Sequence, residues 1–259
     1  MESTRRLAVA GATGLIGAQV VRIARAAGHE VVALSRSGGV DLTEPDSIGD
    51  RLDGVDAVID VTRSPAMDEQ EAVDFFTTVA ANLGAEARAA GVARTVVLSI
   101  VGVDRGQDYG WYVATLAHER ATRQHAPGAR VLRATQFHEF PGQVLERSRQ
   151  GDRALIMDMP TQPVASAEVA RMLVELATDD GDGDVDLAGP RRESLVDLVR
   201  RLVGLRGEDV AVEAVPAAAS MASGSVLPGP DAVIRGVDWD TWAREAVAPA
   251  ARPRDDEER

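Results

Sequence analysis

The chain has 259 residues, a length that suits one large α/β domain or one domain with a small appendage. Hydrophobic residues make up 45% of the chain and charged residues 27%, which excludes collagen-like and largely disordered classes. The net charge of -13 argues against nucleic-acid binding and against an anionic membrane surface, because both would repel an acidic protein. We therefore expect a small-molecule substrate as the partner.

Two amino acids are missing from the sequence. Without cysteine there are no disulfides, thiolate nucleophiles or iron–sulfur clusters. The four histidines, His29, His118, His125 and His138, are not spaced as metal ligands, so no metal site is expected. All 28 basic residues are arginine, which excludes a lysine base or Schiff base. The apolar run at 7–11 is too short for a signal peptide or membrane span, so we expect a cytoplasmic protein.

The first elements predicted along the chain are a strand, a glycine turn and a helix. A β-rich run at 7–10 meets Gly11, and apolar residues at helical spacing continue from Leu15 to a stop at Gly28. A second strand is predicted at 30–35 and a short third strand at 39–41.

The same alternation continues, which predicts a Rossmann-type doubly wound parallel sheet covered on both faces. After residue 134 the pattern is less regular, and we expect a small C-terminal substrate lobe from about residue 136 within one domain, 1–248, followed by a disordered tail, 249–259. Further strands are predicted at 57–61, 95–100, 130–134, 154–157 and 210–212, with helices near 67–90, 110–123, 140–149, 166–177 and 194–203.

The glycine turn is the central functional signal. Glycines here allow a tight turn, close approach of backbone N–H groups to a pyrophosphate, and close packing of helix against strand. Because a strand and a helix flank the motif, we predict dinucleotide binding; the alternative is a purely structural turn. The expected cofactor contacts are Gly11, Thr13, Gly14, Leu15, Ile16 and Gly17.

The end of the second strand indicates which dinucleotide binds. An acidic residue there would select NAD, but the chain has Ser35 and Arg36, which suit the 2′-phosphate of NADP(H). The alternative is a solvated arginine. Asp41 and Leu42 are candidates for the adenine edge, although Asp41 also suits the start of a turn. Val61 and Thr62 end the next strand and are expected to line the adenosine half.

The sequence resembles the atypical short-chain dehydrogenases of the NmrA-like, NAD(P)H-binding group. The resemblance spans roughly residues 5–190 and implies a family of carbonyl reductases, quinone reductases and redox-sensing proteins without catalysis. It rests on the glycine motif 11–17, on Leu98-Ser99-Ile100-Val101-Gly102-Val103-Asp104, on Leu132-Arg133-Ala134-Thr135-Gln136-Phe137-His138-Glu139-Phe140, and on Gln162-Pro163-Val164.

The family pattern implies a serine at the end of the fifth strand, matched here by Ser99, and often a tyrosine and a lysine four residues apart on the next helix. The corresponding positions hold Trp111 and Thr115, so both expected proton-transfer residues are replaced. Tyr112 lies one residue away, which rotates it by about 100° around a helix. It would need a helix shift to serve as the acid, and the alternative is a packed aromatic side chain.

Other polar residues are candidates for substrate contact and proton transfer. Trp111, Thr115 and His118 share one helix face, which makes Trp111 a candidate substrate contact and His118 a candidate proton relay. The alternative for His118 is a histidine without a catalytic task. Ser99 suits a donor to a carbonyl oxygen, or a hydroxyl with a local partner. Gln136, Phe137 and His138 follow a strand that should end at the ligand crevice, so we expect them in the substrate pocket.

Two functions follow from these residues. The first is an NADPH-dependent reductase of a ketone, a quinone or a related small apolar molecule that lacks the usual tyrosine and lysine. The second is a non-redox NADP(H)-binding protein, either a redox sensor or a scaffold recruited for cyclisation or dehydration. A third possibility is that the glycine turn is a relic of the fold that binds nothing.

Overall fold

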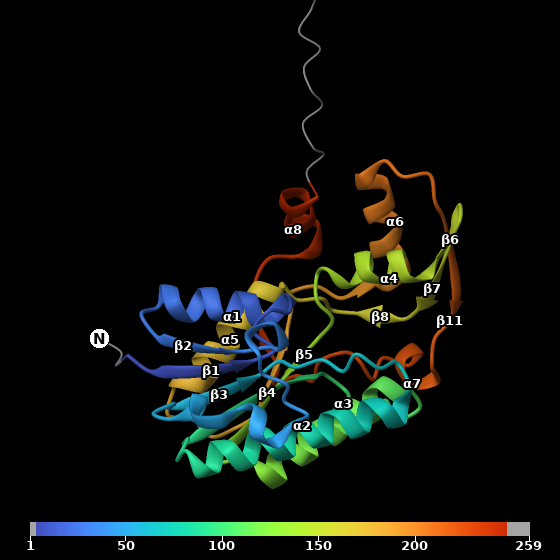
Figure 1. The fold of residues 1–259 in the computed structure, drawn as a ribbon. Helices are drawn as coiled ribbons and strands as arrows, with labels where there is room; N and C mark the ends of the chain where they lie inside the picture. The colour runs from blue at the N-terminus through green and yellow to red at the C-terminus, as the bar shows by residue number, and fades with distance from the viewer. Residues whose placement is uncertain (1–3, 248–259) are drawn as a thin grey trace, which may run out of the picture.

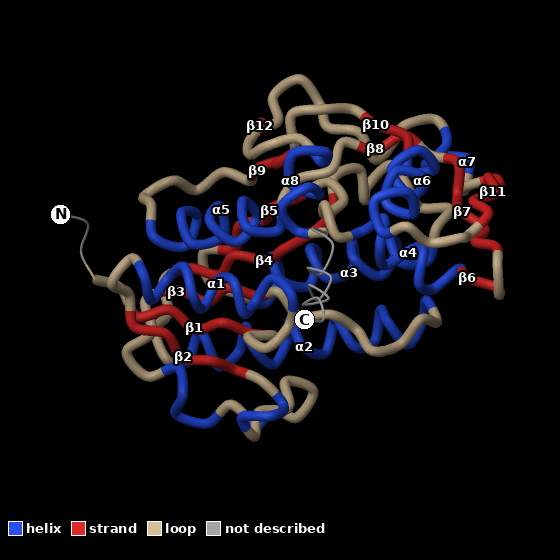
Figure 2. The backbone as a smooth tube through the Cα atoms, turned by 90° about the horizontal axis from the view of Figure 1, so that it is seen from above, coloured by secondary structure: helices blue, strands red, loops and turns tan. Residues whose placement is uncertain are grey.

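The structure is a computed structural model that describes residues 4–247. Its main element is a parallel sheet of seven strands, seen from above in Figure 2. The order across the sheet is β2-β1-β3-β4-β5-β9-β12. The strands are β1 (Arg6–Ala10), β2 (Glu30–Leu34), β3 (Ala57–Asp60), β4 (Arg94–Ile100), β5 (Ala129–Ala134), β9 (Val185–Ala188) and β12 (Val233–Ile234).

Helices cover both faces of the sheet, which confirms the predicted Rossmann-like fold (Figure 1). The helices α1 (Leu15–Ala26) and α5 (Ser166–Thr178) pack together on one face, and α2 (Glu69–Ala89) and α3 (Gly110–His125) pack together on the other. The chain leaves β1 toward β2 and then returns past β1 to build the rest of the sheet from β3. The order therefore reverses between β1 and β3, where such sheets bind ligands at the carboxyl ends of the strands.

One predicted strand is wrong and five short strands were missed. Residues 39–41 form no strand, because the chain turns tightly there: the N–H of Val40 donates to the carbonyl of Ser35, and Gly39 has φ +77°. Two of the missed strands, β9 and β12, extend the main sheet beyond β5. The other three lie in the lobe: β6 (Arg149–Gln150), β8 (Pro160–Thr161) and β10 (Glu193–Ser194). All five have only two to four residues, too few to show an alternating hydrophobic pattern.

A smaller lobe follows β5 and lies beside the carboxyl ends of the strands (Figure 1). The predicted tail, 249–259, lies outside the described residues. The lobe contains a three-stranded sheet of β6 (Arg149–Gln150), β7 (Arg153–Asp158) and β11 (Ala211–Pro216), the two-stranded pair β8 (Pro160–Thr161) and β10 (Glu193–Ser194), and the helices α4 (Phe140–Ser148), α6 (Leu195–Arg206), α7 (Ala219–Ala222) and α8 (Trp239–Ala246).

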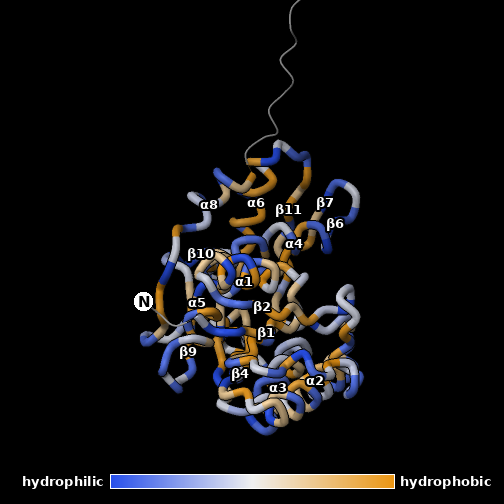
Figure 3. Tube along the Cα trace, turned by 60° about the vertical axis from the view of Figure 1, so that its left-hand side comes forward, coloured by the Kyte–Doolittle hydropathy of each residue, from blue (hydrophilic) through white to orange (hydrophobic). Residues whose placement is uncertain are grey.

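Separate hydrophobic clusters hold the sheet and the lobe together. One cluster lies between the sheet and α1 with α5, a second lies on the opposite face beneath α2, and a third fills the lobe around Leu145, Ile156 and Trp239. Figure 3 shows the hydrophobic segments gathered along the inner strands and the hydrophilic segments mainly in outer turns. Among residues 4–247, no helix is long and apolar enough to cross a membrane.

Candidate functional site

The glycine turn connects β1 to α1 through close backbone contacts. Gly11 has φ +80°, a conformation that favours glycine, and its N–H donates to the carbonyl of Leu34 at 3.1 Å. A Cβ on Gly17 would lie 2.1 Å from the carbonyl oxygen of Gly11, so only glycine lets the helix approach the turn this closely. Gly11 and Gly17 therefore fix the local fold.

The N-terminus of α1 is open to a ligand. Gly14 is its N-cap and supplies no side-chain hydrogen bond, so the first N–H groups of the helix have no capping acceptor. The side chains of Thr13 and Leu15 are exposed, whereas Ile16 is buried and offers only its backbone. A Cβ on Gly14 would meet only the carbonyl oxygen of Gly11, at 3.4 Å, so this side of the turn is otherwise open. An uncapped helix N-terminus with this access fits a pyrophosphate.

The predicted 2′-phosphate contact lies after β2. The Ser35 hydroxyl accepts the N–H of Gly38 and so closes a short 3-10 turn, Arg36–Gly38. Arg36 is exposed, and its guanidinium makes no hydrogen bond or ion pair with any residue between 4 and 247. The guanidinium is thus free to bind an anion beside the crevice.

The next two predicted cofactor contacts have local structural partners. The Asp41 carboxylate accepts hydrogen bonds from the Thr43 hydroxyl at 2.7 Å and from the Thr43 N–H at 3.0 Å. These bonds, together with the nearby charge of Arg36, lower the pKa of Asp41. Leu42 is buried in the cluster beneath α2. Asp41 thus begins a turn, the alternative that the sequence left open.

The loop after β3 lies against the glycine turn. A Cβ on Gly11 would be 2.9 Å from the carbonyl oxygen of Val61, which shows how closely the two loops approach. Both the N–H and the hydroxyl of Thr62 donate to Asp60, at 2.9 and 2.7 Å. Val61 and Thr62 therefore lie at the switch point between β1 and β3, where a bound dinucleotide would pass.

Asp60 is paired with His118 beneath this loop. His118 Nε2 lies 3.0 Å from Asp60 Oδ2, and only 2% of His118 and 1% of Asp60 are exposed. Burial alone would raise the pKa of Asp60, but the neighbouring His118 and the hydrogen bonds from Thr62 outweigh it and lower that pKa. Phe76 of α2 stacks on the imidazole at 4.6 Å. The helix face that carries His118 thus packs against α2 and β3, and the imidazole is not open to the crevice.

Trp111, predicted as a substrate contact, shares this face. Its ring makes an edge contact with Phe76, and the guanidinium of Arg63 lies 5.6 Å from its centre. Thr115, at the position of the family's lysine, donates its hydroxyl to the carbonyl of Trp111. Both residues therefore have local packing or hydrogen-bonding partners.

Ser99 has a buried partner of its own. Its hydroxyl donates to Glu119 Oε1 at 2.5 Å, and only 4% of Ser99 is exposed. Glu119 also accepts two hydrogen bonds from Arg133, at 2.8 and 2.7 Å. The single hydroxyl proton is used inside the protein, so Ser99 does not present a donor to a carbonyl in this arrangement.

Tyr112 is 4% exposed and packs in the hydrophobic cluster of the lobe, as the packed-aromatic alternative expects. Its hydroxyl oxygen lies 3.4 Å from Gln136 Nε2 at the end of β5, and Gln136 Oε1 accepts the Thr161 hydroxyl at 2.7 Å. Burial raises the pKa of Tyr112 above its usual range, which makes the phenol a weaker acid than an exposed tyrosine. The structure thus brings together two residues that the sequence assigned separately to catalysis and to substrate binding.

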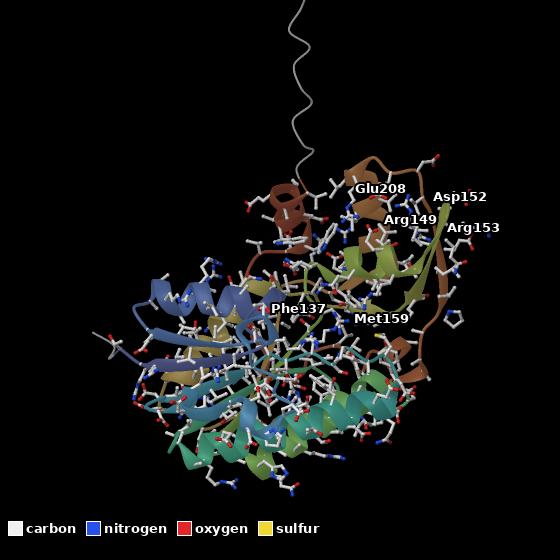
Figure 4. The ribbon with its side chains drawn as sticks, in the orientation of Figure 1. Phe137, Arg149, Asp152, Arg153, Met159 and Glu208 are labelled. Carbon is white, nitrogen blue, oxygen red and sulfur yellow. The ribbon has the colours of Figure 1, made fainter. Side chains whose placement is uncertain are left out.

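Phe137 and His138 lie where the sheet meets the lobe. Phe137 bridges Val164, and Figure 4 shows it near the end of α1, whereas Arg149 and Glu208 lie at the far end of the lobe. His138 is 1% exposed, and its Nε2 lies 3.1 Å from the carbonyl of Pro163. Burial lowers the pKa of His138 to about 4, so the imidazole is neutral at pH 7.

Several partner residues were not identified from the sequence. Asp60 is the only charged residue of the buried strand β3, and a single charge in such a strand was the sequence signal that could have identified it. Glu119 follows His118 directly, but nothing local shows that it faces Ser99. Thr161 is 25 residues from Gln136, so no spacing rule connects them.

Comparison with known proteins supports this assignment of the fold. The family model described as NAD(P)H-binding matches residues 11–180. None of the curated proteins matches the chain significantly.

Solved structures of reductases share the fold at low sequence identity. A dTDP-4-dehydrorhamnose reductase from Clostridium acetobutylicum superposes with a TM-score of 0.72 at 16% identity, over 93% of this chain and 97% of that one. The corresponding enzyme of Bacillus anthracis, in complex with NADP, gives 0.69 at 13%, over 94% and 93% of the two chains. The triphenylmethane reductase of Citrobacter sp. gives 0.69 at 17%, over 93% and 99%.

Proposed function

The chain belongs to the NAD(P)H-binding family, and from that premise we propose that it is an NADPH-dependent reductase of a ketone, a quinone or a related small apolar molecule. The open N-terminus of α1 would hold the pyrophosphate, and Arg36 the 2′-phosphate. The first N–H groups of α1 have no side-chain cap, and the guanidinium of Arg36 makes no hydrogen bond or ion pair with residues 4–247; both features fit this anionic cofactor.

The contact between Tyr112 and Gln136 carries the proposal of catalysis. When bound, the reduced dinucleotide supplies a hydride to the carbonyl carbon, and a proton must reach the carbonyl oxygen to complete the alcohol. Gln136 donates to the oxygen of Tyr112, so the proton of the phenol remains free to be donated to a substrate. Tyr112 therefore takes the place of the family's tyrosine from the adjacent position on the helix.

Replacing the phenol tests this role. In the Tyr112→Phe variant we expect kcat with NADPH and the best substrate of a ketone and quinone panel to fall by about 10²-fold or more, with unchanged affinity for NADPH. The matched control is Tyr109→Phe, because Tyr109 is the only other tyrosine and its ring packs on Tyr112. Equal loss of activity in both variants, or none in either, would contradict the assignment.

A second candidate function is a non-redox NADP(H)-binding protein. The observation that favours it is the packing of Trp111 and Thr115 at the positions of the family's tyrosine and lysine, together with the buried partners of Ser99 and His118. A sensor of this kind would bind NADPH and NADP⁺ with different affinities and turn over no member of the panel. Fluorescence titration with both cofactors, followed by the panel, separates the two functions.

A further inference from the structure

One face of α3 supports the loop that follows β3. This face carries Trp111 and Thr115, at the positions of the family's tyrosine and lysine, and also His118. His118 Nε2 lies 3.0 Å from Asp60 Oδ2 at the end of β3, and the guanidinium carbon of Arg63, three residues further along the chain, lies 5.6 Å from the centre of the Trp111 ring. The helix therefore contacts the loop at two points.

Asp60 uses both oxygens of its buried carboxylate. Oδ1 accepts the N–H and the hydroxyl of Thr62, at 2.9 and 2.7 Å, and Oδ2 faces His118. A buried pair of polar partners is costly to desolvate, and well-packed apolar side chains often stabilise such a position as well or better. Stability alone therefore does not account for a carboxylate here, and its distinctive contribution is the position of Thr62.

Thr62 lies beside the glycine turn. A Cβ on Gly11 would be 2.9 Å from the carbonyl oxygen of Val61 and 3.2 Å from the Cα of Thr62. The N–H of Val61 donates to the carbonyl of Ala10 at 3.1 Å, and both donors of Thr62 are used by Asp60. Neither loop residue thus has a donor left for a phosphate oxygen. The loop acts through its shape, because it bounds the space above the glycine turn where a dinucleotide would pass.

We propose that Asp60 is a positioning residue for the dinucleotide and that His118 holds it in place from α3. By accepting both protons of Thr62, Asp60 keeps the loop in its binding shape before the cofactor arrives, so that binding does not have to order it. The inference rests on the proposed cofactor and not on the proposed reduction. It gives a role to the helix face that lacks the family's tyrosine and lysine.

Replacing the pair by apolar side chains separates position from stability. The Asp60→Leu/His118→Phe double variant removes the acceptor of both Thr62 donors without leaving a buried charge. We expect fluorescence titration to show that NADPH and NADH bind at least about tenfold more weakly, and by the same factor, because the proposed 2′-phosphate contact, Arg36, lies after β2 on the other side of β1. Unchanged affinity in a folded double variant, or a loss confined to NADPH, overturns the proposal.

Two single variants test whether Asp60 acts through Thr62. In Asp60→Asn the amide oxygen can still accept from Thr62 while the amide nitrogen faces His118, so we expect both affinities to stay within about threefold of the wild type. Thr62→Val removes the hydroxyl that Asp60 holds, and we expect binding of both cofactors to weaken by about threefold or more.

The two substitutions should not act independently. Adding Thr62→Val to the double variant should cause no further loss of affinity, because the acceptor of the hydroxyl is already gone. Independent losses would overturn the route through Thr62. So would wild-type affinity in Thr62→Val alone, a result that does not depend on whether the double variant folds. An equal loss in Asp60→Asn and in the double variant would assign the effect to charge and overturn the positioning role.

Arg130→Met is the control for a loss of stability. Arg130 is buried at the amino end of β5, where its guanidinium donates to the carbonyl of Leu176 at 3.0 Å and to Asp179 at 2.5 Å. This pair lies at the edge of the sheet opposite the crevice, so we expect a lower midpoint of thermal unfolding and unchanged affinity for both cofactors. Equal losses of affinity in this control and in the double variant would show that affinity only follows stability, which overturns the proposal.

The titrations need no turnover, which separates this inference from the proposed function. A wild-type protein that binds NADPH but reduces no member of the panel, with weakened binding in the double variant, would refute the reductase and leave Asp60 as a positioning residue. Turnover by the wild type, with unchanged NADPH affinity in the double variant, would refute the positioning role and leave the reductase. A wild-type protein that binds neither cofactor overturns both.

Discussion

Alanine substitutions at two glycines of one turn should affect different properties. We expect Gly17→Ala to lower the stability of the fold and Gly14→Ala to lower the affinity for NADPH. In the Gly17→Ala variant the new methyl group would lie 2.1 Å from the carbonyl oxygen of Gly11 and 2.8 Å from the Cα of Ala12. Ordinary contact begins at 3.4 Å, so α1 must move away from the turn by more than 1 Å in a region where Ala12 is 5% exposed. Backbone atoms cannot rotate aside as a side chain can.

The expected cost follows from two opposing effects. Forced overpacking costs about 1–3 kcal/mol and sometimes more, and alanine in a helix is favoured over glycine by about 1 kcal/mol. Because the overlap here is with backbone, we expect the free energy of unfolding to fall by about 2 kcal/mol or more. This is a large part of the stability of a typical domain, about 5–15 kcal/mol.

Gly14→Ala is the matched variant. Gly14 has φ -75°, which alanine adopts without strain, and the nearest atom to its Cβ is 3.4 Å away. The loss of stability should stay below about 1 kcal/mol, the scale of a changed helix N-cap. The methyl group occupies the side from which a pyrophosphate would approach, so we expect NADPH affinity to fall at least about tenfold.

Urea unfolding and NADPH fluorescence titration of both variants provide the measurements. A Gly17→Ala protein within about 0.5 kcal/mol of the wild type would refute the steric argument. A Gly14→Ala protein that keeps its NADPH affinity would refute the placement of the pyrophosphate at α1.

Three further predictions concern charged and titrating groups. Arg36→Ala should weaken NADPH binding by about tenfold or more and leave NADH binding unchanged, with Arg120→Ala, at an exposed arginine of α3, as control; equal loss for both cofactors would place the 2′-phosphate elsewhere. The pKa of His138 is about 4 in the folded protein, so as pH falls the unfolded chain takes up the proton first. The free energy of unfolding should therefore fall by up to about 3 kcal/mol as pH drops from about 6.5 toward 4. Urea midpoints of the wild type and of His138→Gln should converge over this range, and parallel curves would contradict the pKa shift. His118→Phe should lower the free energy of unfolding by about 3 kcal/mol or more, because it leaves the carboxylate of Asp60 buried without its partner. Adding Asp60→Leu should recover part of that loss in thermal unfolding. A double variant whose loss equals the sum of the two single losses would show that the two side chains are not coupled.

The sequence by itself determined the parts of this protein that depend on neighbouring residues. The strand, turn and helix around Gly11 and Gly17 follow from backbone geometry over seven residues, and an exposed arginine after β2 follows from the position of Arg36 at a strand end. The helices α1 and α3 were predicted nearly to their ends, because their apolar spacing is long and regular.

Only the tertiary structure decided which polar side chains face one another. His118 meets Asp60 across 58 residues of chain, Ser99 meets Glu119 across 20, and Tyr112 meets Gln136 across 24. A helical or strand period shows which face a residue occupies, but not which element packs on that face. A cavity between α4, α6 and α8 depends in the same way on three helices from distant parts of the chain, whose packing no local pattern encodes.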